Sequence, residues 1–165
     1  MKAIKQTAIL FIILVTSLVS AQEKSESELT SKLNNGVHFV AELSDSNVKL
    51  KDSVIITYKL FVAQDIGISN YNMRDYIESE DFKVEDITSS DVKVEYEVFK
   101  NEKYRFVILK KSVLKPKQKG KFELEALVLD FTSEIPSKNS DAFGRLIMEK
   151  VKRTIKTDNI TINVI

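Results

Sequence analysis

The feature that most constrains the fold is an alternation of apolar and polar residues with a period of two. It is longest in segment 54–62, where one face would consist of Val54, Ile56, Tyr58, Leu60 and Val62. Segments 92–99, 122–128 and 160–164 repeat the pattern. Successive side chains of a β-strand point to opposite faces of its sheet, so this period is typical of strands and not of helices. In segment 92–99 the predicted apolar face consists of Val92, Val94, Tyr96 and Val98, opposite a solvated face.

Residues that favour tight turns separate these segments. They lie at 34–36 (Asn-Asn-Gly), 45–47 (Asp-Ser-Asn), 115–120 (Lys-Pro to Gly) and 158–159 (Asp-Asn). Gly and Asn tolerate left-handed backbone, and Pro fixes one turn dihedral angle. Short strands at this spacing indicate an antiparallel β-sandwich. The residues from Pro116 to Gly120 are expected to close a hairpin between two strands.

Two segments fit the strand pattern less well. Residues 70–80 are expected to form one or two helical turns, with Tyr76 and Ile77 packed inward. Farther along, apolar residues recur at every fourth position, which taken alone predicts a helix: Phe143, Ile147, Val151 and Ile155. Residues 151–155 also alternate, however, and they run directly into a turn and the last strand. We therefore predict a strand over 150–157.

The N-terminal residues have the pattern of a secretory signal peptide. Lys2 and Lys5 precede an apolar run at 8–19, and small residues follow up to Ala21. The alternative, an uncleaved membrane anchor, needs about 20 apolar residues, and this run is shorter. We expect cleavage after Ala21 and an exported chain without a transmembrane anchor. Residues 22–36 are polar and charged, so they are expected to be a flexible lead-in to a domain at 37–165.

Charge and composition exclude several classes of function. The 25 basic and 24 acidic residues give a net charge of +1, whereas a nucleic-acid-binding domain is strongly basic. The chain has one His and no Cys, so thiol nucleophiles, redox pairs and Cys/His zinc sites are excluded. No cofactor is expected. A chain that enters an oxidising compartment without disulfides must be held by its core alone.

The sequence has no pattern of a known catalytic or metal site. It lacks a nucleophile elbow, a P-loop and an HExxH motif, and Glu123 and Glu125 lie on a solvated strand face where both would ionise normally. The nearest approaches to a calcium loop are residues 45–47 and 80–81, which offer too few oxygens. His38, near the start of the first strand, is expected to have a structural role. We therefore predict a non-enzymatic protein.

The candidate interaction surface is a run of lysines without an intervening acid: Lys110, Lys111, Lys115, Lys117, Lys119 and Lys121. One interpretation is a cationic hairpin that touches anionic lipid headgroups or an acidic partner. The other is a solvated hairpin whose charges protect an exposed sheet edge from pairing with other chains. Acidic residues collect instead between Asp75 and Glu97.

Several segments resemble the BatD family of oxygen-tolerance (Bacteroides aerotolerance) proteins. Residues 103–124 resemble the family's strand with a Tyr, the Pro-x-x-x-Gly hairpin and the amphipathic strand that follows. Residues 48–58 resemble its early strand pair. Residues 134–136 with 141–144 resemble a loop of members from the Bacteroidetes, and residues 157–164 resemble the closing strand. In order, these segments cover about 37–165.

The resemblance implies a periplasmic immunoglobulin-like domain. Family members carry several such domains and a C-terminal membrane helix. They are encoded beside von Willebrand A-domain proteins and a MoxR-type ATPase. They are associated with aerotolerance or stress survival. The expected function is protein contact in a cell-envelope complex, with no catalytic residues to carry over. Because the sequence stops at Ile165, we expect either a truncated product or a stand-alone first domain.

A second function class is a carbohydrate-binding or adhesive β-sandwich that acts alone. It predicts exposed aromatic side chains on one flat sheet face, for which the candidates are Tyr71, Tyr76 and Tyr104.

Overall fold

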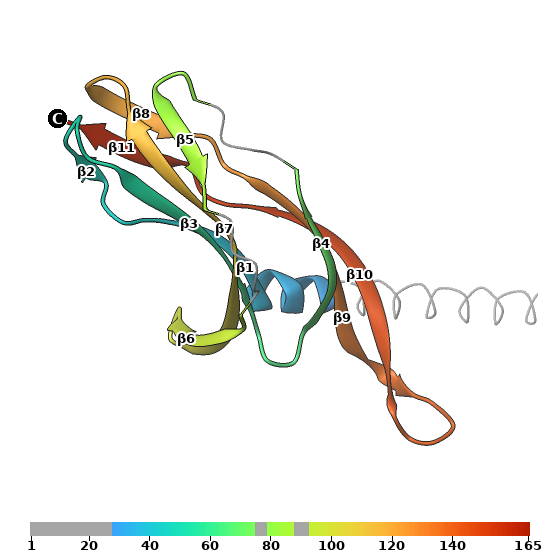
Figure 1. The fold of residues 1–165 in the computed structure, drawn as a ribbon. Helices are drawn as coiled ribbons and strands as arrows, with labels where there is room; N and C mark the ends of the chain where they lie inside the picture. The colour runs from blue at the N-terminus through green and yellow to red at the C-terminus, as the bar shows by residue number, and fades with distance from the viewer. Residues whose placement is uncertain (1–27, 75–78, 88–92) are drawn as a thin grey trace, which may run out of the picture. The chain divides into compact units, whose positions relative to one another are not determined.

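The computed structural model describes residues 28–74, 79–87 and 93–165 (Figure 1). The predicted signal peptide lies outside these residues, as do Tyr76, Ile77 and Val92. The chain divides into two units, Met1–Asn35 and Gly36–Ile165, which are described separately.

A short helix covers residues 28–36, where the sequence predicted a flexible lead-in without regular structure. That prediction was wrong for these residues. Leu29 and Leu33 are four positions apart, so a helix places both on one side, and this spacing outweighs the polar composition around them. The helix ends at Asn-Asn-Gly, residues 34–36, which was predicted as a turn. Gly is the residue that most often ends a helix.

The largest sheet of the second unit has antiparallel strands in the order β1-β3-β7-β5, with β6 also paired to β7. Its strands are β1 (Val37–Leu43), β3 (Val54–Val62), β5 (Phe82–Asp86), β6 (Glu95–Phe99) and β7 (Glu102–Pro116). β7 is long enough to pair β6 at its beginning and β5 at its end, and β3 along its other edge. We call this the large sheet.

Two three-stranded sheets complete the unit. One has the order β10-β9-β4 and is antiparallel, with β4 (Gly67–Met73), β9 (Val128–Ser140) and β10 (Leu146–Lys156). The other has the order β2-β11-β8, with β2 (Asn47–Val48), β8 (Gly120–Leu124) and β11 (Ile160–Val164). In that sheet β11 is parallel to β2 and antiparallel to β8. The predicted all-β class is therefore confirmed, with one short helix added.

The core begins with the predicted face of β3. Val54, Ile56, Tyr58, Leu60 and Val62 are each at most 5% exposed. The other two sheets contribute further buried side chains, which include Leu129, Phe131, Ile135, Ile162 and Val164. The rings of Phe82 on β5 and Phe122 on β8 meet edge to face at 5.4 Å, so the large sheet and the β2-β11-β8 sheet share this core.

A bulge in β7 lets that strand pack on both faces of the large sheet. Tyr58 pairs with Lys110 but Lys59 pairs with Ile108, so Leu109 has no partner on β3. The extra residue exchanges the faces to which later side chains point. Before the bulge, Tyr104 and Phe106 form a second buried cluster with Phe61, on the face opposite Leu60 and Val62.

Three local predictions were wrong because strand pairing overrode the sequence pattern. Segment 122–128 is not one strand: β8 ends at Leu124 and β9 begins at Val128, in a different sheet. The expected hairpin at Pro116–Gly120 is absent among the described pairings, because β7 pairs with β3, β5 and β6 while β8 pairs with β11. Residues 70–73 continue β4 and form no helical turn. The strand predicted for 150–157 is confirmed, since β10 runs to Lys156.

Candidate functional site

The structure does not bring the six candidate lysines together as one cationic surface. Lys110, whose side chain is only 9% exposed, places Nζ 3.0 Å from Asp86 Oδ2. Lys115 Nζ lies 3.0 Å from Glu85 Oε2. These contacts arise because the acid-rich strand β5 pairs with the lysine-rich end of β7. The acidic and basic segments noted in the sequence are therefore partners of each other.

The remaining lysines differ from one another in environment. Lys117 Nζ donates a hydrogen bond to the Glu80 carbonyl oxygen at 3.0 Å. Lys111 is half-buried within β7. Lys119, just before β8, and Lys121, at the start of β8, are both exposed. Lys115 and Lys117 are exposed as well, so this stretch presents charge to solvent from the end of β7 to the start of β8.

Beside Lys110, a polar cluster joins β5 and β7, and the charge of its half-exposed Asp86 also acts on Tyr58 of β3. Ser112 is fully buried, and its Oγ donates a hydrogen bond of 2.6 Å to Asp86 Oδ1. Burial alone would raise the pKa of Asp86, but hydrogen bonds from Ser112 and Lys110 outweigh it and lower that pKa. Burial, followed by the charge of Asp86, raises the pKa of Tyr58 far above its usual value. Tyr58 therefore stays a neutral phenol.

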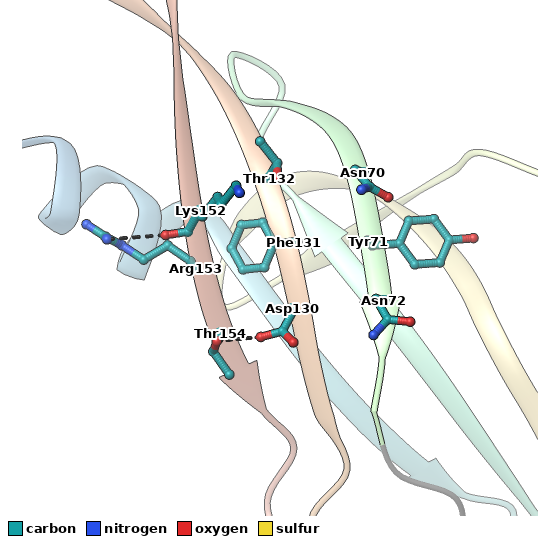
Figure 2. Close-up of a pocket in the computed structure, with 9 residues that line it drawn as sticks. All are labelled: Asn70, Tyr71, Asn72, Asp130, Phe131, Thr132, Lys152, Arg153 and Thr154. Carbon is teal, nitrogen blue, oxygen red and sulfur yellow. Dashed lines mark hydrogen bonds between the residues drawn. The ribbon is translucent and has the colours of Figure 1, made fainter.

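A hollow of about 510 Å³ lies over the β10-β9-β4 sheet, and we call it the polar hollow because most of the residues that line it are polar (Figure 2). It is lined by Asn70, Tyr71, Asn72, Asp130, Phe131, Thr132, Lys152, Arg153 and Thr154. Strand register explains the lining, because Asn72 lies opposite Asp130 on one side of β9 and Thr154 opposite the same residue on the other. Amides, hydroxyls and charged groups from three neighbouring strands thus face a common space.

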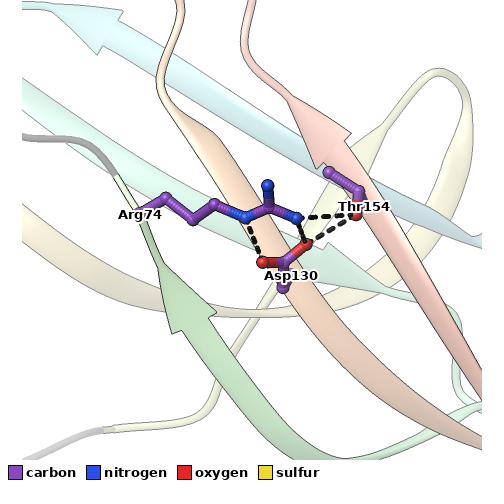
Figure 3. A network of polar contacts seen from close by, with 3 residues as sticks. All are labelled: Arg74, Asp130 and Thr154. Atoms are coloured by element: carbon purple, nitrogen blue, oxygen red, sulfur yellow. Dashed lines mark hydrogen bonds and ion pairs between the residues drawn. The ribbon is translucent and has the colours of Figure 1, made fainter.

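Two of the lining residues, Asp130 and Thr154, form a network with Arg74 (Figure 3). Arg74, just after β4, binds both carboxylate oxygens of Asp130 through Nε and Nη2. Thr154 Oγ1 donates a 2.5 Å hydrogen bond to Asp130 Oδ1. The hydrogen bonds from Arg74 and then Thr154 lower the pKa of Asp130 to about 2. A carboxylate this firmly ionised is a poor general base near neutral pH, so the network fixes strand positions and offers little for catalysis.

Sequence reasoning did not find this network. Arg74 and Asp130 are 56 residues apart, and Asp130 and Thr154 are 24 apart. None of the three belongs to a motif. The only signal in the sequence was the alternation of side chains along the strands, which does not tell which strands are neighbours. The predicted aromatic platform is also not formed in the described residues: Tyr71 is 46% exposed, whereas Tyr104 is buried in the large sheet.

Exposed apolar side chains form a row along one face of β6, beginning with the residue just before it. We call this row the β6 ridge, and it consists of Val94, Tyr96 and Val98, which are 56%, 63% and 70% exposed. The prediction that this face packs inward was wrong. On the opposite face Phe99 is packed instead, because its ring stacks on Phe61 with ring centroids 4.4 Å apart, whereas the other residues of β6 are exposed. Glu97 on the same face lies 3.4 Å from Lys59.

The β6 ridge borders an apolar hollow of about 260 Å³. The hollow is lined by Leu60, Val62, Ile68, Tyr71, Val94, Arg105, Phe106 and Val107. Leu60 and Val62 belong to the core face of β3, so the ridge and hollow continue the core outward at this end of the large sheet. The guanidinium of Arg105 is held by the Ile66 carbonyl oxygen.

The remaining sequence candidates have local structural roles. Asp45 Oδ1 accepts a hydrogen bond from the Asn47 amide at 2.8 Å, and Asp81 Oδ1 accepts one from Gln118 Nε2 at 2.6 Å. Nowhere in residues 28–74, 79–87 and 93–165 do three acidic or histidine side chains converge as a metal site would need. His38 lies on β1 with its ring 5.5 Å from that of Tyr104.

In the described part of the chain, no helix combines the length and the hydropathy that crossing a membrane requires. Comparisons of the chain with protein families, with curated proteins and with solved structures gave no match.

Proposed function

We propose that this chain is a non-catalytic, exported protein-interaction module of the cell envelope, similar to the BatD family of oxygen-tolerance proteins. Residues 1–21 are its signal peptide, and the domain that follows is an immunoglobulin-like β-sandwich in the periplasm or at the periplasmic side of the inner membrane. Its partner is a von Willebrand A-domain protein, in a complex that supports aerotolerance or stress survival. The antiparallel strands and the ordered segments that resemble the family support this proposal.

The observation that carries the proposal is the β6 ridge with its adjoining hollow. Among the described residues β6 pairs only with β7, so it is an edge strand. Natural proteins usually protect such edges with charges, bulges or covering elements, because an open edge can pair with another chain. Here Tyr96 and Val98 are more than 60% exposed beside that edge. Exposed apolar side chains that gather in this way mark an interaction site.

The geometry favours recognition of a partner segment by strand addition. A strand placed beside β6 would form main-chain hydrogen bonds along it, while its side chains pack on the ridge. The 260 Å³ hollow next to Val94 would take one large apolar side chain of the partner. Tyr96 lies two residues along the ridge from Val94, which lines the hollow. Aromatic residues of this kind are typical of the few that supply most of the binding energy of an interface.

The test is capture of a von Willebrand A-domain protein from an envelope fraction in mild detergent, with the full chain as bait. We expect capture by the wild type and a loss of at least tenfold with Tyr96→Ala, since removing an interface aromatic costs about 2 kcal/mol or more. The matched control is a double variant, Lys119→Glu and Lys121→Glu, which should retain capture. If no such protein is captured, the complex is refuted. If only the lysine variant loses capture, the contact surface is the lysine stretch instead.

The polar hollow favours a second candidate function, a stand-alone carbohydrate-binding or adhesive module. Side chains of Asn70, Asn72 and Thr132 offer the donors and acceptors that a sugar needs, and Tyr71 lies at its border (Figure 2). Binding on a glycan array that is lost with Asn72→Ala but kept with Tyr96→Ala would favour this function. A wild-type chain that binds no glycan would eliminate it.

A further inference from the structure

The hairpin between β9 and β10 extends beyond the strand that flanks it (Figure 1). β9 pairs with β10 from Val128 to Ser140, but β4 covers β9 only from Leu129 to Glu134. The rest of the hairpin is a two-stranded ribbon. Its end carries four of the exposed large apolar side chains of the described chain: Phe143 (84%), Leu146 (57%), Ile147 (46%) and Met148 (46%). We call these four residues the apolar tip.

The apolar tip faces more than one direction. Alternation along a strand directs Leu146 and Met148 to one side and Ile147 to the other. The pairing with β9 also shifts register between Leu146 and Met148, and such an irregularity increases the local twist of the ribbon. Phe143 lies in the connecting loop, before β10 begins. A flat protein surface would cover only one of these faces. An apolar medium that surrounds the end of the hairpin would cover all of them.

The loop already pairs four of the backbone amides that would lose water in such a medium. The amides of Phe143 and Arg145 both donate to Asp141 Oδ1, at 2.8 and 3.0 Å. The Gly144 amide donates to the Asp141 carbonyl, and the Asp141 amide to the Arg145 carbonyl. Arg145 Nε lies 2.8 Å from Asp141 Oδ2, so the carboxylate is also paired. An unpaired backbone group costs several kcal/mol when it leaves water, and these groups avoid that cost.

Basic residues come after the apolar tip along β10, so they would lie at the headgroups of a bilayer when the tip lies in the layer below. Residues 141–156 contain five basic and two acidic residues, a formal charge of +3. Beyond Met148 the strand carries Glu149 and then three basic residues, Lys150, Lys152 and Arg153, which lie farther from the loop than the apolar residues. Lys150 Nζ lies 3.5 Å from Glu134 Oε1 on β9, so Lys152 and Arg153 supply most of the charge available to a headgroup. Clustered cations near a membrane are attracted to anionic headgroups, while apolar side chains enter the layer below.

We propose that the end of the β9–β10 hairpin inserts its apolar tip into the interfacial layer of an anionic lipid bilayer, with the basic residues of β10 at the headgroups. This site is distinct from the β6 ridge, and the inference is independent of the protein contact proposed above. Bilayer contact at this hairpin would hold the domain at a membrane surface without any spanning segment.

A single tryptophan can report this contact directly, because the chain contains none. Phe143→Trp places the reporter in the apolar tip, and Tyr96→Trp, on the exposed β6 ridge, is the matched control. Each full-length variant is mixed with vesicles containing phosphatidylglycerol or with vesicles of phosphatidylcholine alone. We expect a blue shift of emission, and quenching by brominated lipid, only for Phe143→Trp with the anionic vesicles. The signal is local, so attachment of another part of the chain does not produce it.

Two substitutions extend the test. Adding Ile147→Ser to Phe143→Trp should weaken partitioning of the reporter about tenfold, since burial of one aliphatic side chain contributes about that factor. Adding Lys150→Glu and Lys152→Glu should weaken it on anionic vesicles by a similar factor. An emission spectrum of Phe143→Trp that stays unshifted with both vesicles would overturn the proposal, as would equal shifts on neutral and anionic vesicles. Loss of protein capture by Phe143→Ser without any vesicle effect would replace the bilayer by a protein partner.

Discussion

Replacing Phe99 by Ala should detach β6 from the large sheet. The Phe99 ring stacks on Phe61 at 4.4 Å with 13° between the ring planes, and it meets Tyr104 edge to face at 5.9 Å. Phe99 is half-buried, and it is the last residue of β6. The ring is thus the main apolar contact that holds the strand against the cluster of Phe61, Tyr104 and Phe106.

The expected loss of stability follows from area and ring geometry. A buried Phe removes about 150–250 Å² from water, so a half-buried ring removes about 100 Å², equivalent to about 2.5 kcal/mol at 25 cal/mol per Å². The stacked pair adds about 0.5–1.5 kcal/mol. Phe99→Ala should therefore lower the free energy of unfolding by about 3 kcal/mol, which is large against the roughly 5–15 kcal/mol of a typical domain.

The assay is urea-induced unfolding followed by circular dichroism, with hydrogen exchange to locate the effect. Exchange should accelerate over β6 and the beginning of β7 while β8 and β11 keep their protection. Tyr96→Ala is the matched control, since it removes an aromatic ring from the exposed face of the same strand and should cost less than about 0.5 kcal/mol. Equal effects of the two variants, or a loss below about 1 kcal/mol for Phe99→Ala, would refute the assignment of the packed face.

Three further predictions concern polar contacts. The pKa of Asp130 falls from 3.8 to about 2 on folding, so its contribution to stability is present above pH 4 and disappears as the pH falls toward 2. The difference in urea midpoint between wild type and Asp130→Asn should therefore shrink over that range, and a pH-independent difference would contradict the prediction. Thr157→Val keeps the side-chain volume but removes the Oγ1 that accepts the buried Leu127 amide at 3.0 Å, so it should cost about 1–3 kcal/mol, measured by the same unfolding assay. Lys110→Met removes the ammonium partner of Asp86 and should cost about 1 kcal/mol, because the carboxylate stays partly in water; a neutral result would show that the ion pair contributes nothing.

The strands themselves were predictable because alternation is a property of consecutive residues. The inward face of β3 and the strand character of β11 follow from the local period alone. For β10 the period fitted both a helix and a strand, and the turn and last strand that follow it decided for the strand. The helix at 28–36 was also readable in principle, since Leu29 and Leu33 have helical spacing, but the polar composition around them hid it.

Which face of a strand is buried depended on its neighbours. Val94, Tyr96 and Val98 outnumber Phe99, the one apolar residue on the opposite face of β6, so the sequence favoured the wrong side. In the structure Phe99 is the side chain of β6 that packs, because it stacks on Phe61 of β3. No local pattern contains this information, because it depends on which residues a paired strand presents.

The sequence by itself therefore determined that the chain alternates its side chains and forms β-strands. Only the tertiary structure decided that the lysines of β7 meet the acids of β5, that Arg74, Asp130 and Thr154 converge, and that apolar side chains remain exposed on β6 and at the end of the β9–β10 hairpin. The physical reason is distance along the chain: the period of a strand is set by adjacent residues, whereas pairing, charge neutralisation and exposure are set by residues tens of positions away.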